Sequence, residues 1–159
     1  ALTGHLVFTT VHANNALDVI GRFTHMGIDP YNFVSSLNCI MAQRLVRKLC
    51  RNCRKPMQQI VGQLQESDIT EDQCKGATLY EPNGCQACNG TGYLGRSAIV
   101  ELLEFNDEFR DLIIHRASMA HLKQAAQRQG TVFLREAAVE KFLAGETSLR
   151  EINRVTFVE

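Results

Sequence analysis

The chain has 159 residues, and apolar residues make up 45% of it, which is typical of a folded protein with its own core. Lys and Arg number 17 and so do Asp and Glu, so the composition gives no reason to expect binding to nucleic acid or to an anionic membrane. No apolar run approaches the roughly 18 to 20 residues that span a bilayer, and no secretory signal opens the sequence.

The first residues have the pattern of a buried strand. Residues 5–11 (HLVFTTV) are rich in β-branched and aromatic types, which favour strands. The chain has no initiator Met and starts within this pattern. We therefore expect it to be a piece of a longer protein, whose other part would hold some of the chemistry.

Two helices are expected next. The first is capped by Asn14 or Asn15 and runs to Met26. The second begins at Asp29-Pro30, because Asp is a good N-cap and Pro suits the first helical position. Apolar residues at helical spacing carry this helix towards position 46: Phe33, Leu37, Ile40 and Met41.

The segment 50–97 differs in composition from what precedes it. It contains two C-x-x-C pairs, a group of glycines and a polar stretch, which indicate a small inserted subdomain with a short helix over 58–66. A strand is expected over 96–103. The remainder is predicted to be helical, with a capping box (S-x-x-E) at Ser148–Glu151 starting the last helix and earlier helices over 107–116, 118–129 and 131–144.

Four of the six cysteines form the two pairs, Cys50 with Cys53 and Cys85 with Cys88. Each C-x-x-C turn lets two thiolates point the same way, and two turns can supply the four sulfurs, at about 2.3 Å, of a tetrahedral Zn²⁺ site. Thiolate ligands favour zinc over a hard cation, and a closed shell of sulfurs predicts a structural metal. A redox-active pair is the alternative, but the strand and long helix that flank a thioredoxin-like C-x-x-C are not predicted here.

Two cysteines and a basic stretch remain. Cys39 lies on the apolar side of the second expected helix and is predicted to be part of the core, whereas Cys74 is predicted to have no role. Positions 44–55 hold six basic residues and no acid. This stretch beside a zinc knuckle allows a different function, a zinc ribbon that binds nucleic acid, although no aromatic platform accompanies it.

Three motifs resemble a known family. Residues 3–14 (TGHLVFTTVHAN) resemble the His box of the ATPases that drive type II secretion and type IV pilus assembly. Residues 42–50 (AQRLVRKLC) resemble the segment that leads into the family's first zinc knuckle, and residues 84–96 (GCQACNGTGYLGR) resemble its second knuckle. The motifs occur in the family's order and cover essentially the whole chain, so the chain is identified as a member of its zinc-containing branch.

The resemblance implies an α/β fold with three parts. Residues 1–49 would be the C-terminal part of a RecA-like P-loop ATPase core, residues 50–97 an inserted four-cysteine zinc subdomain, and residues 98–159 a C-terminal strand and helical region. It also implies a homo-hexameric cytoplasmic ATPase, peripheral at the bacterial inner membrane, which moves an inner-membrane platform of partner proteins. Neither nucleic-acid binding nor direct membrane insertion is expected.

ATP and Mg²⁺ would belong to the full-length protein only. The chain has no G-x-x-x-x-G-K-[ST] loop to hold phosphates and no Walker B segment, so by itself it is expected to be inactive.

By the same resemblance, His12 and His5 would be catalytic, near the γ-phosphate or at a subunit boundary. Thr10, Asn14 and Arg44 would contact the nucleotide. Each of these three has a plainer interpretation, as a strand former, a helix cap and a basic helix end respectively. A third function, chaperone-like, is suggested by the C-x-x-C-x-G-x-G form of residues 85–92, which resembles the zinc repeats of Hsp40 co-chaperones but occurs here once.

Overall fold

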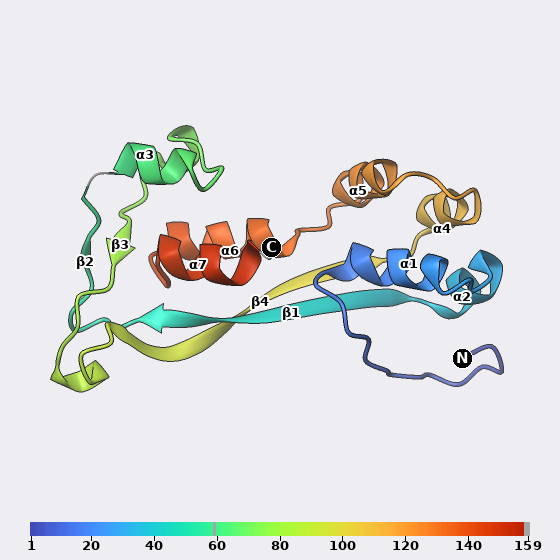
Figure 1. Ribbon diagram of the computed structural model, residues 1–159, viewed down its shortest axis with the longest axis horizontal. Coiled ribbons are helices and arrows are strands. Elements are labelled where there is room, and N and C mark those ends of the chain that lie inside the picture. The colour runs from blue at the N-terminus through green and yellow to red at the C-terminus, as the bar shows by residue number, and fades with distance from the viewer. Residues whose placement is uncertain (59, 158–159) are drawn as a thin grey trace. The chain divides into compact units, whose positions relative to one another are not determined.

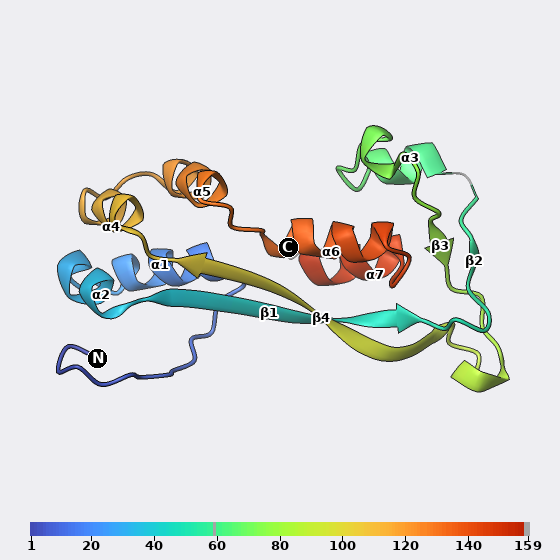
Figure 2. The same ribbon diagram turned by 180° about the vertical axis from the view of Figure 1, so that it is seen from behind.

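The computed structural model describes residues 1–58 and 60–157, and the chain divides into two compact units. Unit 1 comprises residues 1–43 and 100–133, and unit 2 comprises residues 44–99 and 134–159. The strands β1 (Cys39–Leu49) and β4 (Tyr93–Glu104) pair with each other and contribute residues to both units. Their arrows point in opposite directions, so the pair is antiparallel (Figures 1 and 2). The three segments expected from the sequence (1–49, 50–97 and 98–159) have other boundaries than these units. That the three segments are functional domains stays a prediction.

The helices of unit 1 begin where side chains can cap them. They are α1 (Ala16–His25), α2 (Pro30–Ser36), α4 (Asp107–Ile114) and α5 (Met119–Arg128). In each, the residue before the helix accepts a hydrogen bond from the backbone N–H three positions on, which satisfies a donor that the helix leaves unpaired. These capping residues are Asn15, Asp29, Asn106 and Ser118.

The core of unit 1 is built on aromatic rings. Phe23, Phe33, Phe105 and Phe109 form a series of edge-to-face contacts, with ring centroids 5.5, 6.5 and 5.5 Å apart. The buried carboxylate of Glu101 in β4 accepts a hydrogen bond of 2.9 Å from the backbone N–H of Ala16. It thereby holds the first turn of α1 against the strand. Helices α4 and α5 lie next to each other, as the view from behind also shows (Figure 2).

Unit 2 combines a helix pair with the cysteine-bearing segment. Helices α6 (Leu134–Leu143) and α7 (Leu149–Thr156) pack side by side (Figure 1). The cysteine-bearing segment contains a short antiparallel ladder, two 3₁₀ turns and a helix: β2 (Lys55–Pro56), β3 (Tyr80–Glu81), η1 (Asp72–Cys74), η2 (Gln86–Cys88, within the second cysteine pair) and α3 (Ile60–Gln65). Position 59 of the helix expected over 58–66 lies outside the described residues.

A buried carboxylate joins β1 to α7. Glu151 accepts from the backbone N–H of Arg47 at 3.0 Å and from the guanidinium groups of Arg47 and Arg154, at 2.7 Å in the shortest contact of each. The capping box was expected to turn Glu151 back to the helix start. Ser148 caps α7 as predicted, at 3.2 Å from the N–H of Glu151, but the Glu151 side chain binds the two arginines instead.

The strand predicted over residues 5–11 is wrong for this chain. These residues have no regular secondary structure, and Leu6 and Phe8 are 75% and 89% exposed. β-branched and aromatic residues favour a strand only where a neighbouring strand supplies hydrogen bonds and a surface to pack on. No described strand pairs with them, because β1 pairs with β4.

The second helix is also shorter than predicted. It ends at Ser36, and Cys39–Leu49 is the strand β1. Ile40 and Val46 are an even number of positions apart, so they share one face of a strand, while Cys39 falls on the opposite, exposed face. The prediction that Cys39 belongs to the core is therefore wrong. The remaining helices and the strand over 96–103 are confirmed to within a few residues.

Stability should depend on pH through Glu151. Burial alone would raise the pKa of this carboxyl group, but hydrogen bonds from Arg154 and Arg47 outweigh it and lower the pKa from 4.5 to about 2. The stabilisation, about 3 kcal/mol, is therefore present above pH 4.5 and is lost as the pH falls towards 2. In urea titrations between pH 6 and pH 2, Glu151→Gln should be less stable at pH 6 and should lose less stability on acidification. Glu140→Gln, at an exposed position of α6, should keep the wild-type slope.

Candidate metal centre

The four cysteines of the two C-x-x-C pairs come together at one point of unit 2. Their sulfur atoms all lie within 4.8 Å of one another. The Sγ–Sγ distances are 3.9 Å for Cys50–Cys85, 3.8 Å for Cys53–Cys88 and 3.8 Å for Cys85–Cys88. A tetrahedron with metal–sulfur bonds of about 2.3 Å has edges of about 3.8 Å. The cluster therefore has the spacing of a four-thiolate metal site.

Backbone N–H groups point at the sulfurs. Gly84 donates to Cys53 Sγ at 3.3 Å, and Cys85 and Gly92 each donate to Cys88 Sγ at 3.2 Å. Burial raises the pKa of the Cys53 thiol to about 11, whereas at Cys88 the backbone hydrogen bonds overcome burial and lower the pKa to about 6. Such donors stabilise thiolates, which are the form of cysteine that binds metal.

Two glycines permit the chain to fold this tightly. Gly84 has φ of +109°, and a Cβ there would lie 2.6 Å from the carbonyl oxygen of Gly90. Gly92 has φ of +77°, and its Cβ would lie 2.5 Å from Cβ of Pro82. Both positions combine a left-handed backbone with a contact that leaves no room for a side chain.

The cluster is fastened to the helices of unit 2. Arg54, next to Cys53, donates a hydrogen bond of 2.7 Å to the carbonyl of Gly145 in the α6–α7 turn, and its guanidinium stacks on the ring of Tyr80 at 4.2 Å. Arg135 of α6 donates to the Ser67 carbonyl in the segment between the cysteine pairs. That segment also buries more apolar residues than its polar sequence suggested: Met57, Leu64, Ile69 and Leu79.

The other predicted site residues do not form a common site with the cysteines. His5, Thr10 and His12 are exposed in the irregular N-terminal segment of unit 1, and no described contact joins His5 to His12. Asn14 lies just before α1, where its backbone N–H donates to Asp18, and the cap itself is Asn15. Arg44 is half-buried in β1 of unit 2.

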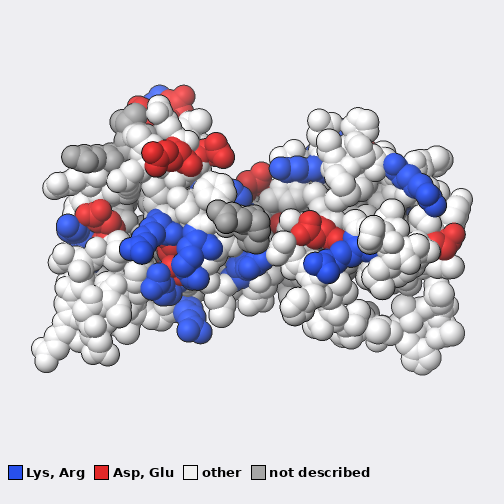
Figure 3. Space-filling view, viewed as in Figure 1, with Lys and Arg blue, Asp and Glu red and all other residues white. Residues whose placement is uncertain are grey.

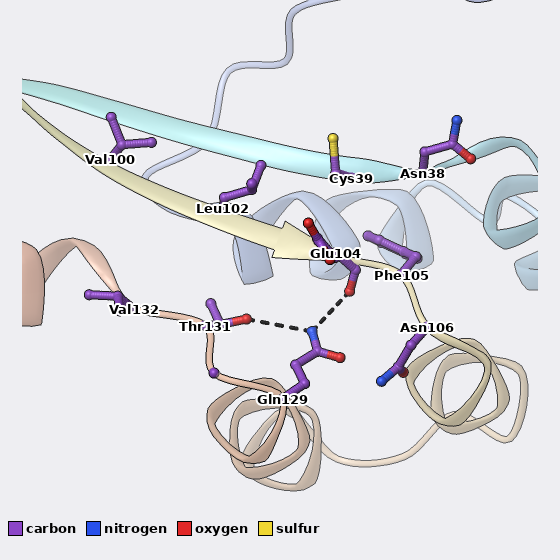
Figure 4. A pocket seen from close by; sticks show the side chains of 11 residues that line it. Asn38, Cys39, Val100, Leu102, Glu104, Phe105, Asn106, Gln129, Thr131 and Val132 are labelled. Atoms are coloured by element: carbon purple, nitrogen blue, oxygen red, sulfur yellow. Dashed lines mark hydrogen bonds between the residues drawn. The ribbon is translucent and has the colours of Figure 1, made fainter.

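Cys39 lies at a pocket on the exposed face of the strands in unit 1 (Figure 4). The pocket has a volume of about 800 Å³, and Gln129 closes one side by donating to the Glu104 carbonyl at 2.9 Å. Val100, Leu102 and Val132 give it an apolar surface. Cys74 lies half-buried in η1, away from the metal-ligand group.

Several members of the basic stretch bind other residues of the chain. Arg47 binds Glu151, Arg54 binds Gly145, and Lys55 forms an ion pair of 3.1 Å with Glu81. Sequence reasoning missed these roles, because each partner is distant in the sequence. The one available signal was that Glu151 lies among the apolar residues Leu149, Ile152 and Val155 at helical spacing, which places a carboxylate on the packed face of α7.

The sequence profile of the family described as Type II/IV secretion system protein matches residues 1–154. The chain belongs to this family. This member of the type II/IV secretion system protein family contains, within the described residues, no helix both long and apolar enough to cross a membrane.

The relatives of this secretion-family chain include proteins named for type IV pilus assembly and for type II secretion. It is 44% identical, over 96% of its length, to the type IV pilus assembly ATPase PilB of Myxococcus xanthus (strain DK1622), and the match covers 27% of that protein. It is 41% identical, over 96% of its length, to PilB of Thermus thermophilus, of which the match covers 17%. It is 40% identical, over 98% of its length, to type II secretion system protein E of Dickeya dadantii, of which the match covers 30%. The chain thus spans less than a third of these relatives.

The glycine at position 92 should be required for the cysteine cluster. Gly92→Ala combines a left-handed φ with the 2.5 Å clash on Pro82, so we expect a loss of stability of about 2 to 4 kcal/mol and weaker metal binding. Gly95→Ala is the matched control, because Gly95 has φ of +80° but open space around its Cβ. It should lose about 1 kcal/mol and bind metal normally. Denaturation and Co²⁺ titration of both variants measure the difference; equal losses would contradict the steric argument.

Proposed function

We propose that this chain is the C-terminal part of an ATPase that powers type II secretion or type IV pilus assembly, with a structural Zn²⁺ on Cys50, Cys53, Cys85 and Cys88. The observation that carries the proposal is that the four-cysteine cluster lies within the segment that matches the family. The family match spans residues 1–154, and the four cysteines within it have the sulfur spacing of a tetrahedral site.

The donor set favours zinc among the metals. Four thiolates are soft ligands, and the described residues place no carboxylate or imidazole in the group. Bound Zn²⁺ would neutralise charge among the thiolates and would leave no position open for water, so it would stabilise the fold rather than take part in hydrolysis. The chain's own contribution is to orient the sulfurs through the N–H donors of Gly84, Cys85 and Gly92.

The finer parts of the proposal concern the longer protein. There, residues 1–49 would complete a RecA-like core that binds ATP and Mg²⁺, and six copies would form a cytoplasmic ring that moves an inner-membrane platform. His12 and His5 would act near the γ-phosphate, with Thr10, Asn14 and Arg44 contacting the nucleotide. The names of the pilus relatives, which are called ATPases, support an ATPase of this kind.

The chain should contain about one zinc ion when purified without added metal, as four thiolates form one tetrahedral shell. Elemental analysis measures this content. Cys85→Ser should lower it to a small fraction and reduce the melting temperature. Cys39→Ser is the matched control, because Cys39 is exposed in β1 and outside the metal-ligand group. Wild-type protein without metal, or with disulfides at these cysteines, would refute the zinc site.

In the full-length protein, His12→Ala should lower ATP turnover by roughly tenfold or more, equivalent to about 1.4 kcal/mol of transition-state stabilisation. The reason is that an imidazole near the γ-phosphate can hydrogen-bond a phosphate oxygen or the attacking water. Steady-state phosphate release measures turnover, and zinc content and melting temperature should stay unchanged. The 159-residue chain alone should give no turnover. Normal hydrolysis by the variant would show that His12 has no catalytic role.

A further inference from the structure

Two arginines of unit 2 are held in fixed positions by one buried carboxylate. Arg47 donates to Glu151 through Nε at 3.0 Å and Nη2 at 2.7 Å, and Arg154 donates through Nε at 3.1 Å and Nη2 at 2.7 Å. The Arg47 guanidinium also stacks on the Tyr93 ring at 4.2 Å. Long side chains that would otherwise be free to move are therefore held rigidly.

Each of these two arginines still has N–H groups that can donate a hydrogen bond to a further partner. The Nη1 group of neither Arg47 nor Arg154 has an acceptor among the described residues, and their side chains are 43% and 57% exposed. Glu151, in contrast, is 0% exposed. Its single negative charge is thus hidden, while two guanidinium groups remain in contact with solvent.

A third arginine extends the same surface. Arg150 and Arg154 are four positions apart in α7 and so lie on one face of the helix. Arg150 is exposed, and none of the described residues binds its side chain. Figure 3 shows Lys and Arg side chains gathered over α7. Arg47, Arg150 and Arg154 are called the arginine patch below.

We propose that the arginine patch binds a short segment of a partner protein that is rich in Asp and Glu. The planar guanidinium fork matches a carboxylate, and arginines already ordered by Glu151 lose little entropy on binding one. The patch carries three guanidinium groups, and Glu151, the carboxylate that two of them bind, is hidden, so the patch attracts additional anions. This binding is separate from zinc retention and from ATP hydrolysis.

A local acidic segment fits the surface better than an extended polyanion. Unit 2 carries twelve Lys and Arg against ten Asp and Glu, so its charge outside the patch is nearly balanced. Nucleic acid and anionic membranes bind through extended basic surfaces. The ring of Tyr93, which could stack on a base, is already covered by Arg47.

The test uses the whole chain and a fluorescein-labelled peptide of ten glutamates, with anisotropy measured at about 50 mM salt, where charge contacts are only partly screened. Arg150→Ala should weaken binding at least about fivefold, and Arg150→Glu should weaken it further. Because Arg150 binds no described side chain, both variants should keep the wild-type zinc content and circular dichroism. Arg128→Ala is the matched control, an exposed arginine on helix α5 of unit 1, and should change affinity by less than about twofold.

Two further titrations distinguish an acidic peptide from the other polyanions, a lipid membrane and a nucleic acid. Vesicles containing phosphatidylglycerol and a single-stranded 20-nucleotide DNA are titrated against the same variants. Binding of either that is tighter than peptide binding and depends on Arg150 would overturn the proposal in favour of that partner. Absence of peptide binding by the wild-type chain, or equal losses in Arg150→Ala and Arg128→Ala, would also overturn it.

Discussion

The buried carboxylate of Glu151 is the interaction on which the arrangement of unit 2 depends. It accepts hydrogen bonds from the backbone of β1 and from a side chain of β1, and so attaches α7 to the strand that leads into the first cysteine pair. A charged group without exposure to water is stable only when it is fully paired, and here two guanidinium groups do this. Loss of either arginine would leave Glu151 short of partners, so strand, helix and carboxylate form one cooperative unit.

The cysteine cluster and this ion group stabilise the same two strands at neighbouring positions. Arg47 lies three residues before Cys50 in β1, and Tyr93, on which Arg47 stacks, directly follows Gly92 of the second knuckle. Tyr93 also shares a hydrogen bond of 2.7 Å with Ser148, the cap of α7. Loosening the knuckles would therefore disturb the strand ends that position the Glu151 partners, which couples metal binding to the packing of the C-terminal helices.

The sequence was most informative where a local rule decides the structure. Asp29 and Ser148 were recognised as helix caps because a capping side chain needs only a backbone N–H three residues on. The cysteine pairs were recognised because two-residue spacing fixes which way the thiols point.

The errors have one physical cause, the dependence on distant partners. Residues 5–11 have strand propensity, but no strand of the described part of the chain lies beside them. The apolar residues of β1 fit helical as well as strand spacing, and only the pairing with β4, which is distant in the sequence, makes this segment a strand. The hydrogen bonds from Ala16 to Glu101 and from Arg47 to Glu151 were also missed, since the partners lie 85 and 104 positions apart in the sequence.

The exposed N-terminal segment has a consequence for how the isolated chain behaves in concentrated solution. Residues 6–11 (LVFTTV) contain no charge and no proline, and the first Asp, Glu, Lys or Arg of the chain is Asp18. Short uncharged segments with high strand propensity pair with copies of themselves into cross-β stacks when their backbone is free. Since Leu6 and Phe8 are exposed and no charged gatekeeper residue flanks them, this segment is the site from which aggregation of the isolated chain would begin.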